Sequence, residues 1–331
     1  MPKARSPCPS FGRLRCGNLR MRLLLVGCSG FVGRELVPFL LELGHSLTLL
    51  SRRAQPFPAR ADGQLQCLRL NPADPASWDR DELRRALAEA DGVVNLAGEP
   101  IAEKRWSDVH RQLLRSSRLE TTRLLVGAMA RLPRPPAVLV SASAVGYYGT
   151  DPEAQFSEAS GAGSDFLAGL CQDWEQAAAA VPSPCRLVIL RIGIVLAADG
   201  GALGKMLPVF RAGFGGPVGN GQQWMSWIHR HDLCRLIAAA LEDPAYCGTY
   251  NAVAPEPVPM ARFAADLGRV LGRPSLLPVP APVLQLLLGD GARVVLEGQR
   301  VRSERLEGQG FRFQYPDLSS ALAAATSPGP R

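Results

Sequence analysis

The feature that most constrains the fold is an apolar run that leads directly into three regularly spaced glycines. Residues 21–26 have the pattern of a buried strand, and Gly27, Gly30 and Gly33 follow with the spacing G-x-x-G-x-x-G before a helical pattern begins. Gly27 allows a tight turn, Gly30 lets backbone N–H groups approach a diphosphate, and Gly33 lets helix and strand pack closely. This order of strand, glycine loop and helix predicts a dinucleotide-binding site.

The end of the second predicted strand bears on which dinucleotide is bound. Proteins that bind NAD usually place an Asp or Glu there for the ribose hydroxyls, whereas this chain has no carboxylate in the segment LLSRR at residues 49–53. Arg52 and Arg53 can pair with a 2′-phosphate, and Ser51 can donate a hydrogen bond to it. We therefore expect NADP as the cofactor, the alternative being that both arginines are ordinary solvated loop charges.

A third segment, VVNLAG at residues 93–98, ends a predicted strand in small residues. Small side chains at the carboxyl end of a strand leave space for a cofactor to lie across it, although a tight turn explains them equally well. The residues expected to contact the cofactor are Gly27, Ser29, Gly30, Phe31, Val32, Gly33, Ser51, Arg52, Arg53, Asn95, Ala97 and Gly98.

From Met21 onward, apolar strand-like runs alternate with helical patterns, which is typical of a parallel sheet with crossover helices. The sequence predicts an α/β fold with a Rossmann-type doubly wound parallel sheet. After Gly193, segments interrupted by Gly and Pro indicate a smaller C-terminal substrate lobe that is interleaved with the core. The expected strands are 22–26, 46–50, 65–70, 92–96, 137–141 and 186–190, and the expected helices are about 31–43, 79–89, 107–131 and 164–180. The expected organisation is a leader at 1–20, an NADP-binding core at 21–195 and a mostly substrate-binding lobe at 196–331.

Charge and cysteine usage exclude several classes of function. The net charge is +7, but the first twenty residues supply +5 of it, so the remaining chain is nearly neutral and no nucleic-acid partner is expected. The eight cysteines form no C-x-x-C pair and lie near no His cluster, which predicts no metal site and favours a reducing compartment. No apolar run approaches the roughly 18 residues of a membrane span.

The first twenty residues have no apolar core of a secretory signal, so we expect a cytoplasmic protein with a disordered leader or an upstream start. An organellar transit peptide is the alternative.

The chain resembles the extended short-chain dehydrogenase/reductase superfamily, and more narrowly its atypical "epimerase family protein" (SulA-like) branch of NAD-dependent epimerases and dehydratases. The segments that carry the resemblance run through most of the chain. They include VGCSGFVG, VVNLAGEPIAEKRW, SRLETTRLL, SASAVGYYG, SDFLAGLCQDWE, LRIGIVL, NAVAPEPV and GFRFQYPDL. The resemblance implies a Rossmann-type fold, NADP binding, a C-terminal substrate lobe and a homodimer formed through the helices at about 107–131 and 164–180.

The superfamily also implies a Ser that polarises the reacting group and a Tyr four residues before a Lys. Ser143 lies at the end of a predicted strand, where the Ser belongs. The positions of the Tyr and Lys are occupied by Leu167 and Cys171, neither of which can do the same work. Because losing a general acid or base typically costs ~10²- to 10⁴-fold in rate, an unmodified superfamily mechanism is not expected.

Three other residues are candidates for the missing proton transfer. Tyr147 and Tyr148 leave the same strand end as Ser143, but a phenol with a pKa of about 10 needs a cationic neighbour, for which Lys205 is a candidate. His229 titrates near neutral pH when exposed to solvent. The alternative for all three is packing and hydrogen bonding within the fold.

Two functions follow from these features. The first is an NADP(H)-dependent oxidoreductase or epimerase that acts on a small polar or sugar-like metabolite, with Ser143 orienting the substrate. The second, suggested by the absent Tyr and Lys, is a non-catalytic NADPH-binding regulatory protein, related to cell or plastid division.

Overall fold

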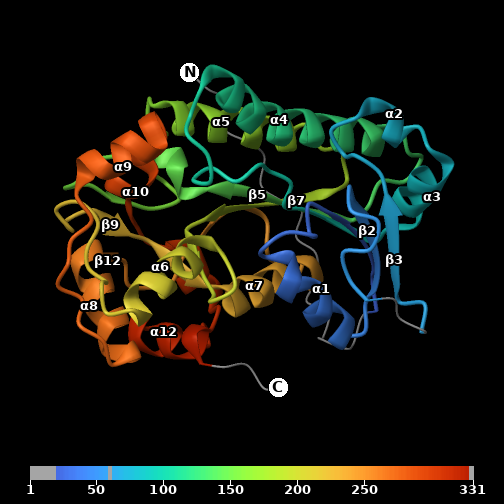
Figure 1. The fold of residues 1–331 in the computed structure, drawn as a ribbon. Coiled ribbons are helices and arrows are strands. Elements are labelled where there is room, and N and C mark those ends of the chain that lie inside the picture. Colours follow the sequence, from blue (N-terminus) through green and yellow to red (C-terminus); the bar gives the residue numbers. More distant parts are fainter. Residues whose placement is uncertain (1–19, 59–61, 328–331) are drawn as a thin grey trace.

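A seven-stranded parallel sheet forms the centre of the molecule (Figure 1). The computed structural model describes residues 20–58 and 62–327, so all but Arg20 of the expected leader lies outside the described residues. The strand order is β11-β7-β5-β4-β1-β2-β3, which confirms the predicted Rossmann-type doubly wound α/β fold. The strands of this sheet are β1 (Arg22–Val26), β2 (Ser46–Ser51), β3 (Leu65–Arg69), β4 (Gly92–Asn95), β5 (Val138–Ala144), β7 (Arg186–Ile192) and β11 (Gly248–Ala252).

Helices cover both faces of the sheet, as parallel strands require (Figure 1). Side chains define where the longest ones begin: Ser107 accepts a hydrogen bond from the backbone of His110 at the start of α4, and Asp165 accepts one from Ala168 at the start of α5. One face carries α1 (Gly33–Glu42) and α7 (Arg230–Glu242), and the other carries α2 (Pro75–Trp78), α3 (Asp81–Glu89), α4 (Asp108–Ala130) and α5 (Phe166–Ala179).

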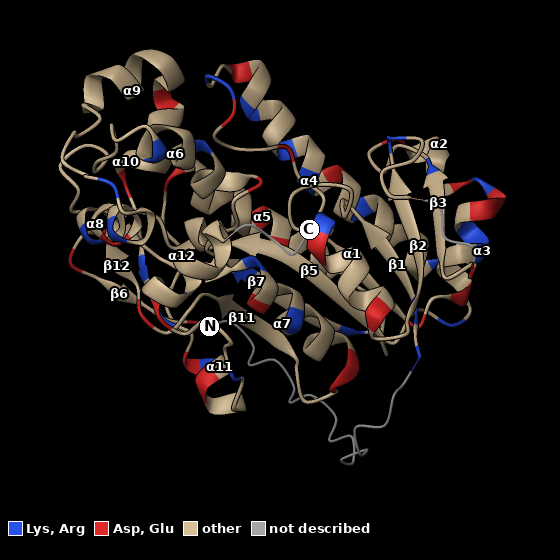
Figure 2. Ribbon diagram, turned by 60° about the horizontal axis from the view of Figure 1, so that its bottom comes forward, with Lys and Arg blue, Asp and Glu red and all other residues tan. Residues whose placement is uncertain are grey.

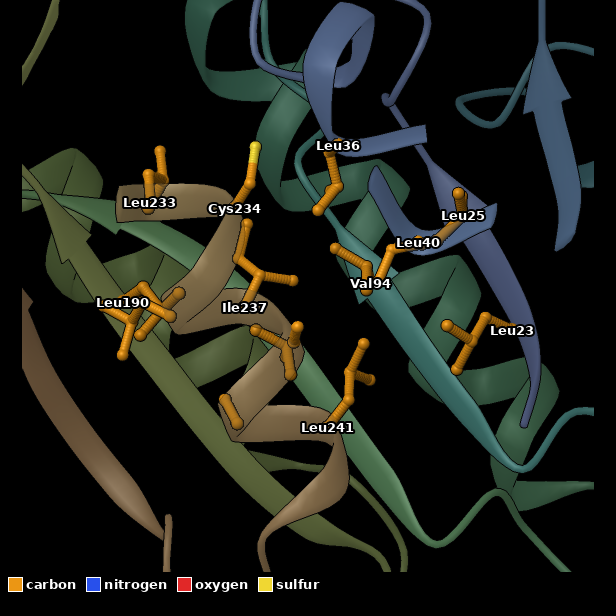
Figure 3. Packing of buried hydrophobic residues seen from close by; sticks show 14 of the residues in the cluster. Leu23, Leu25, Leu36, Leu40, Val94, Leu190, Leu233, Cys234, Ile237 and Leu241 are labelled. Carbon is orange, nitrogen blue, oxygen red and sulfur yellow. The ribbon is translucent and has the colours of Figure 1, made fainter. Parts of the chain in front are cut away.

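Alternate residues of the central strands enter two different cores. Leu23 and Leu25 of β1 pack with α1 and α7 on one side of the sheet, and Figure 3 labels Leu36 of α1 and Ile237 of α7 as members of the same cluster. Leu24 belongs to a second buried cluster, which lies between the opposite face of the sheet and the helices α3 and α4. Because both faces of the strand are buried, its sequence is continuously apolar.

The segment after β7 builds a second lobe with a core of its own, formed mainly by α6, α8 and α12 (Figure 1). The chain returns from this lobe to the sheet through α7 and β11, so the two parts are interleaved. Among the described residues, β11 is the sheet strand that the sequence did not predict, because its segment GTYNA is short and mixes polar with apolar side chains. The remaining elements are β6 (Gln155–Phe156), β8 (Ile194–Leu196), β9 (Trp224–Met225), β10 (Trp227–His229), β12 (Val258–Pro259), β13 (Arg300–Val301), η1 (Val145–Tyr148), η2 (Gly289–Ala292), α6 (Gly201–Arg211), α8 (Met260–Leu271), α9 (Ala281–Leu288), α10 (Arg293–Leu296), α11 (Glu304–Gln309) and α12 (Leu318–Thr326).

Lys, Arg, Asp and Glu are spread over the outer helices, and both signs alternate along α3 and α11 (Figure 2). None of the helices in the described part of the chain is long and apolar enough to cross a bilayer.

Candidate active site

The glycine loop between β1 and α1 contains three glycines. Backbone packing excludes a side chain at Gly27 and Gly33, but not at Gly30. Gly27 has φ +77° and a Cβ there would lie 2.4 Å from the backbone nitrogen of Ala97, while a Cβ on Gly33 would lie 1.7 Å from the carbonyl of Cys28. At Gly30 a Cβ would meet only the Gly27 carbonyl oxygen, at 3.7 Å. Gly30 therefore leaves open space beside the start of α1, which fits a diphosphate approaching the backbone.

The end of β2 presents two exposed arginines. Ser51 is buried and its Oγ accepts a hydrogen bond from the backbone of Arg53 at 3.0 Å. Arg52 and Arg53 are exposed, and neither has a carboxylate within 4.0 Å among the described residues. Two free guanidiniums at this edge fit a phosphate group.

The end of β4 is fixed by a buried amide. Oδ1 of Asn95 accepts a hydrogen bond from the backbone of Ala97 at 3.2 Å, and its Nδ2 donates to Thr122 of α4 at 2.9 Å. Asn95 lies behind the cavity described next, whereas Ala97 and Gly98 line it. Its amide therefore holds the turn that exposes those two small residues.

A cavity of about 390 Å³ lies between the carboxyl edge of the sheet and the second lobe. It brings together Val32 from the glycine loop, Ala97 and Gly98 from the β4 end, and Ser143 from β5. Leu167 and Cys171, at the positions of the superfamily Tyr and Lys, also line it. Most of the remaining wall is apolar and includes Leu96, Ile101, Trp106, Phe166, Leu170, Trp174, Ile194, Met225 and Val294.

Ser143 is held by a buried ion pair. Its Oγ donates to Oε1 of Glu175 at 2.7 Å, and Arg191 donates to both carboxylate oxygens of Glu175, at 2.8 and 2.9 Å. Burial would lower the pKa of Arg191, but its hydrogen bonds to Glu175 outweigh that effect and raise it. Since the hydroxyl proton of Ser143 is directed to Glu175, its oxygen is left to accept a hydrogen bond from a ligand.

The two tyrosines lie beneath this ion pair and do not line the cavity. The hydroxyl of Tyr148 donates to Oδ1 of Asn251 at 2.7 Å and accepts from Arg191 at 3.0 Å. Burial raises the pKa of Tyr148, while Arg191 and Asn251 act in the opposite direction. The ring of Tyr147 lies 3.3 Å from Cζ of Arg191. Arg191 is thus their cationic neighbour, whereas Lys205 donates to the carbonyl of Ala102.

His229 also lies away from the cavity, at the start of α7. Its Nδ1 accepts a hydrogen bond from the backbone of His231 at 3.2 Å, and its ring packs on Tyr315 with centroids 4.1 Å apart. Burial lowers the pKa of His229 to about 4. The imidazole is therefore neutral at physiological pH and caps the helix.

Sequence reasoning did not single out two charged residues of the site, Glu175 and Arg118. Glu175 follows Cys171 by four residues and Leu167 by eight, so the helical period places all three on one face of α5. Arg118 follows Leu114 by four residues and precedes Thr122 by four within a buried face of α4. A charged residue at the helical spacing of otherwise buried positions is therefore the sequence signal that could have identified Glu175 and Arg118.

No group of His, Cys, Asp and Glu in the described ranges has the arrangement of a metal site. The glycine loop, the sheet order and the cavity at the carboxyl edge of the strands define a Rossmann-type dinucleotide-binding protein. The model of the NAD dependent epimerase/dehydratase family matches residues 23–252, and a domain of unknown function, DUF1731, matches residues 279–325. The chain belongs to the NAD dependent epimerase/dehydratase family, which confirms the resemblance seen in its sequence.

Relatives extend over nearly the whole chain. The Arabidopsis thaliana "Epimerase family protein SDR39U1 homolog, chloroplastic" is 42% identical over 311 residues, which cover 92% of this chain and 86% of that protein. The crystal structure of human epimerase family protein SDR39U1 (isoform2) with NADPH has a TM-score of 0.82 at 37% identity, covering 92% of this chain and 99% of that one. The nucleoside-diphosphate sugar epimerase from Corynebacterium glutamicum has a TM-score of 0.71 at 30% identity, covering 93% and 58%.

Proposed function

We propose that this chain is an NADP(H)-dependent oxidoreductase or epimerase of the extended short-chain dehydrogenase class, with Ser143 as a catalytic residue. The observation that carries the proposal is that one cavity borders both Val32, at the start of α1, and Ser143, at the end of β5. A cofactor held by the glycine loop and a substrate touching Ser143 would therefore share one cavity. The human relative crystallised with NADPH supports the choice of cofactor.

The proposed cofactor site uses the residues around three strand ends. The space at Gly30 would admit the diphosphate, Arg52 and Arg53 would pair with the 2′-phosphate, and Ala97 and Gly98 would leave room for the rest of the molecule. Bound NADP(H) supplies a hydride donor or acceptor. The further contacts proposed are Gly27, Ser29, Phe31, Val32, Gly33, Ser51 and, through the turn that it holds, Asn95.

The proposed role of Ser143 is to orient the substrate. Its oxygen accepts a hydrogen bond from a substrate hydroxyl while its own proton remains on the bond to Glu175. Arg191 keeps Glu175 in place, and Tyr148 in turn holds Arg191. Tyr147 and Tyr148 are therefore positioning residues in this proposal, and His229 maintains the start of α7.

The non-catalytic alternative rests on Leu167 and Cys171. Both face the cavity at the positions of the superfamily acid and cation, and burial raises the pKa of Cys171 to about 11. A neutral thiol and an alkyl group supply neither a proton at neutral pH nor a fixed positive charge.

Turnover separates the two functions. Purified protein is incubated with NADPH or NADP⁺ and a panel of small polar carbonyl and hydroxyl metabolites, including sugars, while absorbance of NADPH is followed. We expect turnover with at least one metabolite and a fall in kcat of about 10²-fold in Ser143→Ala, with NADPH affinity retained. Ser116→Ala, at a half-buried serine of α4 that does not line the cavity, is the matched control. Tight NADPH binding without turnover across the panel would favour the regulatory protein.

We also propose the organisation that the sequence suggests, with an NADP-binding core at 21–195 and a mostly substrate-binding lobe at 196–331. The separate core formed by α6, α8 and α12 supports this division. A homodimer through α4 and α5, which pack against each other, is proposed from the resemblance alone. A cytoplasmic location is proposed, with an organellar one as the alternative that the chloroplastic relative keeps open.

A further inference from the structure

The cavity contains a buried positive charge that the proposed mechanism does not use. Arg118 of α4 is 8% exposed, lines the cavity and stacks its guanidinium over the ring of Trp174 at 5.3 Å. Nη1 donates to the carbonyl of Leu114 at 3.1 Å and Nη2 donates to the carbonyl of Glu99 at 2.9 Å. Both partners are neutral backbone groups, and a guanidinium has five N–H donors.

No carboxylate balances this charge within the described residues. The structure gives Arg118 no salt bridge there, and the side chain of Glu99 is paired with Lys104 at 3.5 Å instead. Burial lowers the pKa of Arg118, and the carboxylate of Glu99 only partly offsets this. Burying a cation without a counter-ion is unfavourable, so a ligand that brings a negative charge into the cavity would remove a large part of that penalty.

The local packing reserves the position of this guanidinium. A Cβ on Gly98 would lie 3.0 Å from Cζ of Arg118, so the absence of a side chain at Gly98 makes room for it. On its other side, the short Cys171 stands next to it in the same wall. The charge is therefore built into the cavity wall and is not a flexible surface side chain that happens to fold inward.

The rest of the cavity lining indicates which chemical class of ligand would bring the negative charge to Arg118. Aromatic and aliphatic side chains such as Trp106, Phe166 and Leu170 form most of the wall. Its other charged residues include Asp165 and the mutually paired Arg293 and Glu297, so a ligand that is largely apolar fits the space. One guanidinium balances one unit of charge, and a planar carboxylate accepts two parallel hydrogen bonds from it, whereas a phosphate brings up to two charges into an apolar site.

We propose that Arg118 binds the carboxylate of an apolar monocarboxylic acid, with Ser143 accepting a hydrogen bond from a donor group on the same molecule. This inference rests on the proposed function in one respect only, namely that the cavity is the substrate site. It restricts the carbonyl and hydroxyl substrates of the proposed function to those that carry a carboxylate on an otherwise largely apolar body.

The test uses full-length protein already saturated with NADPH and measures binding by isothermal titration calorimetry. The probes are apolar monocarboxylates from benzoate to 4-phenylbutanoate, each paired with its primary amide, together with inorganic phosphate. At least one carboxylate is expected to bind 10-fold or more tightly than its amide, and phosphate is expected to bind more weakly than that carboxylate. Equal affinity of every acid and amide, no binding of any acid, or tighter binding of phosphate would overturn the inference.

Arg118→Met removes the charge and keeps an apolar side chain of similar length. It is expected to reduce the preference for carboxylate over amide by at least 10-fold while the NADPH dissociation constant stays within twofold. Arg123→Met, at an exposed arginine of the same helix, is the matched control and should change neither value. Arg118→Lys keeps the charge without the paired donors and should retain an intermediate preference, which provides a second variant if Arg118→Met does not fold.

An unchanged carboxylate preference in both Arg118 variants would contradict the inference. So would a loss of NADPH affinity of 10-fold or more in Arg118→Met, because Arg118 would then serve the cofactor. Failure of the wild-type protein to bind NADPH would instead count against the proposed function, so the two failures are distinguishable.

Discussion

Arg191 and Arg118 are buried to a similar degree, but Arg118 lines the cavity whereas Arg191 lies behind Ser143 and contacts it through Glu175. Arg191 on β7 is 5% exposed and makes a two-bond ion pair with Glu175, whereas Arg118 on α4 bonds only to backbone carbonyls among the described residues. Their pKa values accordingly shift in opposite directions, raised for Arg191 and lowered for Arg118. We infer from this difference that the charge of Arg191 stabilises the folded protein, whereas the charge of Arg118 binds a ligand.

The largest effect is expected from removing the paired arginine. Arg191→Met leaves Glu175 buried without its counter-ion, which typically costs about 3–5 kcal/mol of unfolding free energy. Urea denaturation followed by circular dichroism measures it. The double variant Arg191→Met/Glu175→Leu should recover most of the loss because it removes both charges. A single variant as stable as wild type would show that the ion pair is not structural.

The second effect concerns His229, whose buried imidazole is neutral at physiological pH. Burial lowers the pKa of His229 to about 4 in the folded protein, against about 6.5 when unfolded, so the unfolded state binds more protons between these values. Unfolding free energy is therefore expected to fall as the pH drops from 6.5 towards 4, by at most ~1.4 kcal/mol per pH unit. His229→Asn keeps a residue that can cap α7 and should flatten this slope. If the unfolding free energy of His229→Asn depends on pH as steeply as that of wild type, another residue is responsible for the pH dependence.

The third effect concerns Arg52 and Arg53, which are exposed, unlike the buried Arg191 and Arg118. Arg52→Ala and Arg53→Ala should each weaken NADPH binding by about 10-fold, or ~1.4 kcal/mol, because each removes a charged partner of the 2′-phosphate. NADH affinity should not change, since that cofactor lacks the phosphate. Arg123→Ala serves as the control for a general change in charge. Equal losses for both cofactors would contradict the assignment.

The smallest effect has the opposite sign to the first. In ligand-free protein, Arg118→Met is expected to raise the unfolding free energy by about 1 kcal/mol, because it removes a buried charge that has no counter-ion. Urea denaturation of Arg118→Met beside Arg191→Met measures both signs in one experiment. Destabilisation of Arg118→Met by several kcal/mol would mean that its charge, like that of Arg191, belongs to the fold.

The sequence predicted most of the fold because the information is local. Continuous apolar runs and helical patterns predicted six sheet strands and the helices α1, α3, α4 and α5 close to their observed bounds. The glycine loop was predictable for the same reason, since Gly27, Gly30 and Gly33 act within one turn.

The side-chain network of the site could not be predicted in the same way. Ser143 was predicted at a strand end, but its partner Glu175 comes from α5 and the counter-ion of that residue comes from β7. Tyr148 meets Asn251 across 103 residues. Such pairings depend on how the elements pack, so residue type alone did not show that Tyr147 and Tyr148 lie outside the cavity wall.

The open space at Gly30 is proposed to hold the diphosphate of NADPH, and the dissociation constant of NADPH measures whether it does. Isothermal titration calorimetry compares wild type, Gly30→Val and Gly161→Val, the last placing the same side chain in open space away from the site. The account predicts NADPH binding by wild type and Gly161→Val, and a loss of at least 100-fold in Gly30→Val at an unchanged melting temperature. Wild-type affinity in Gly30→Val would contradict it.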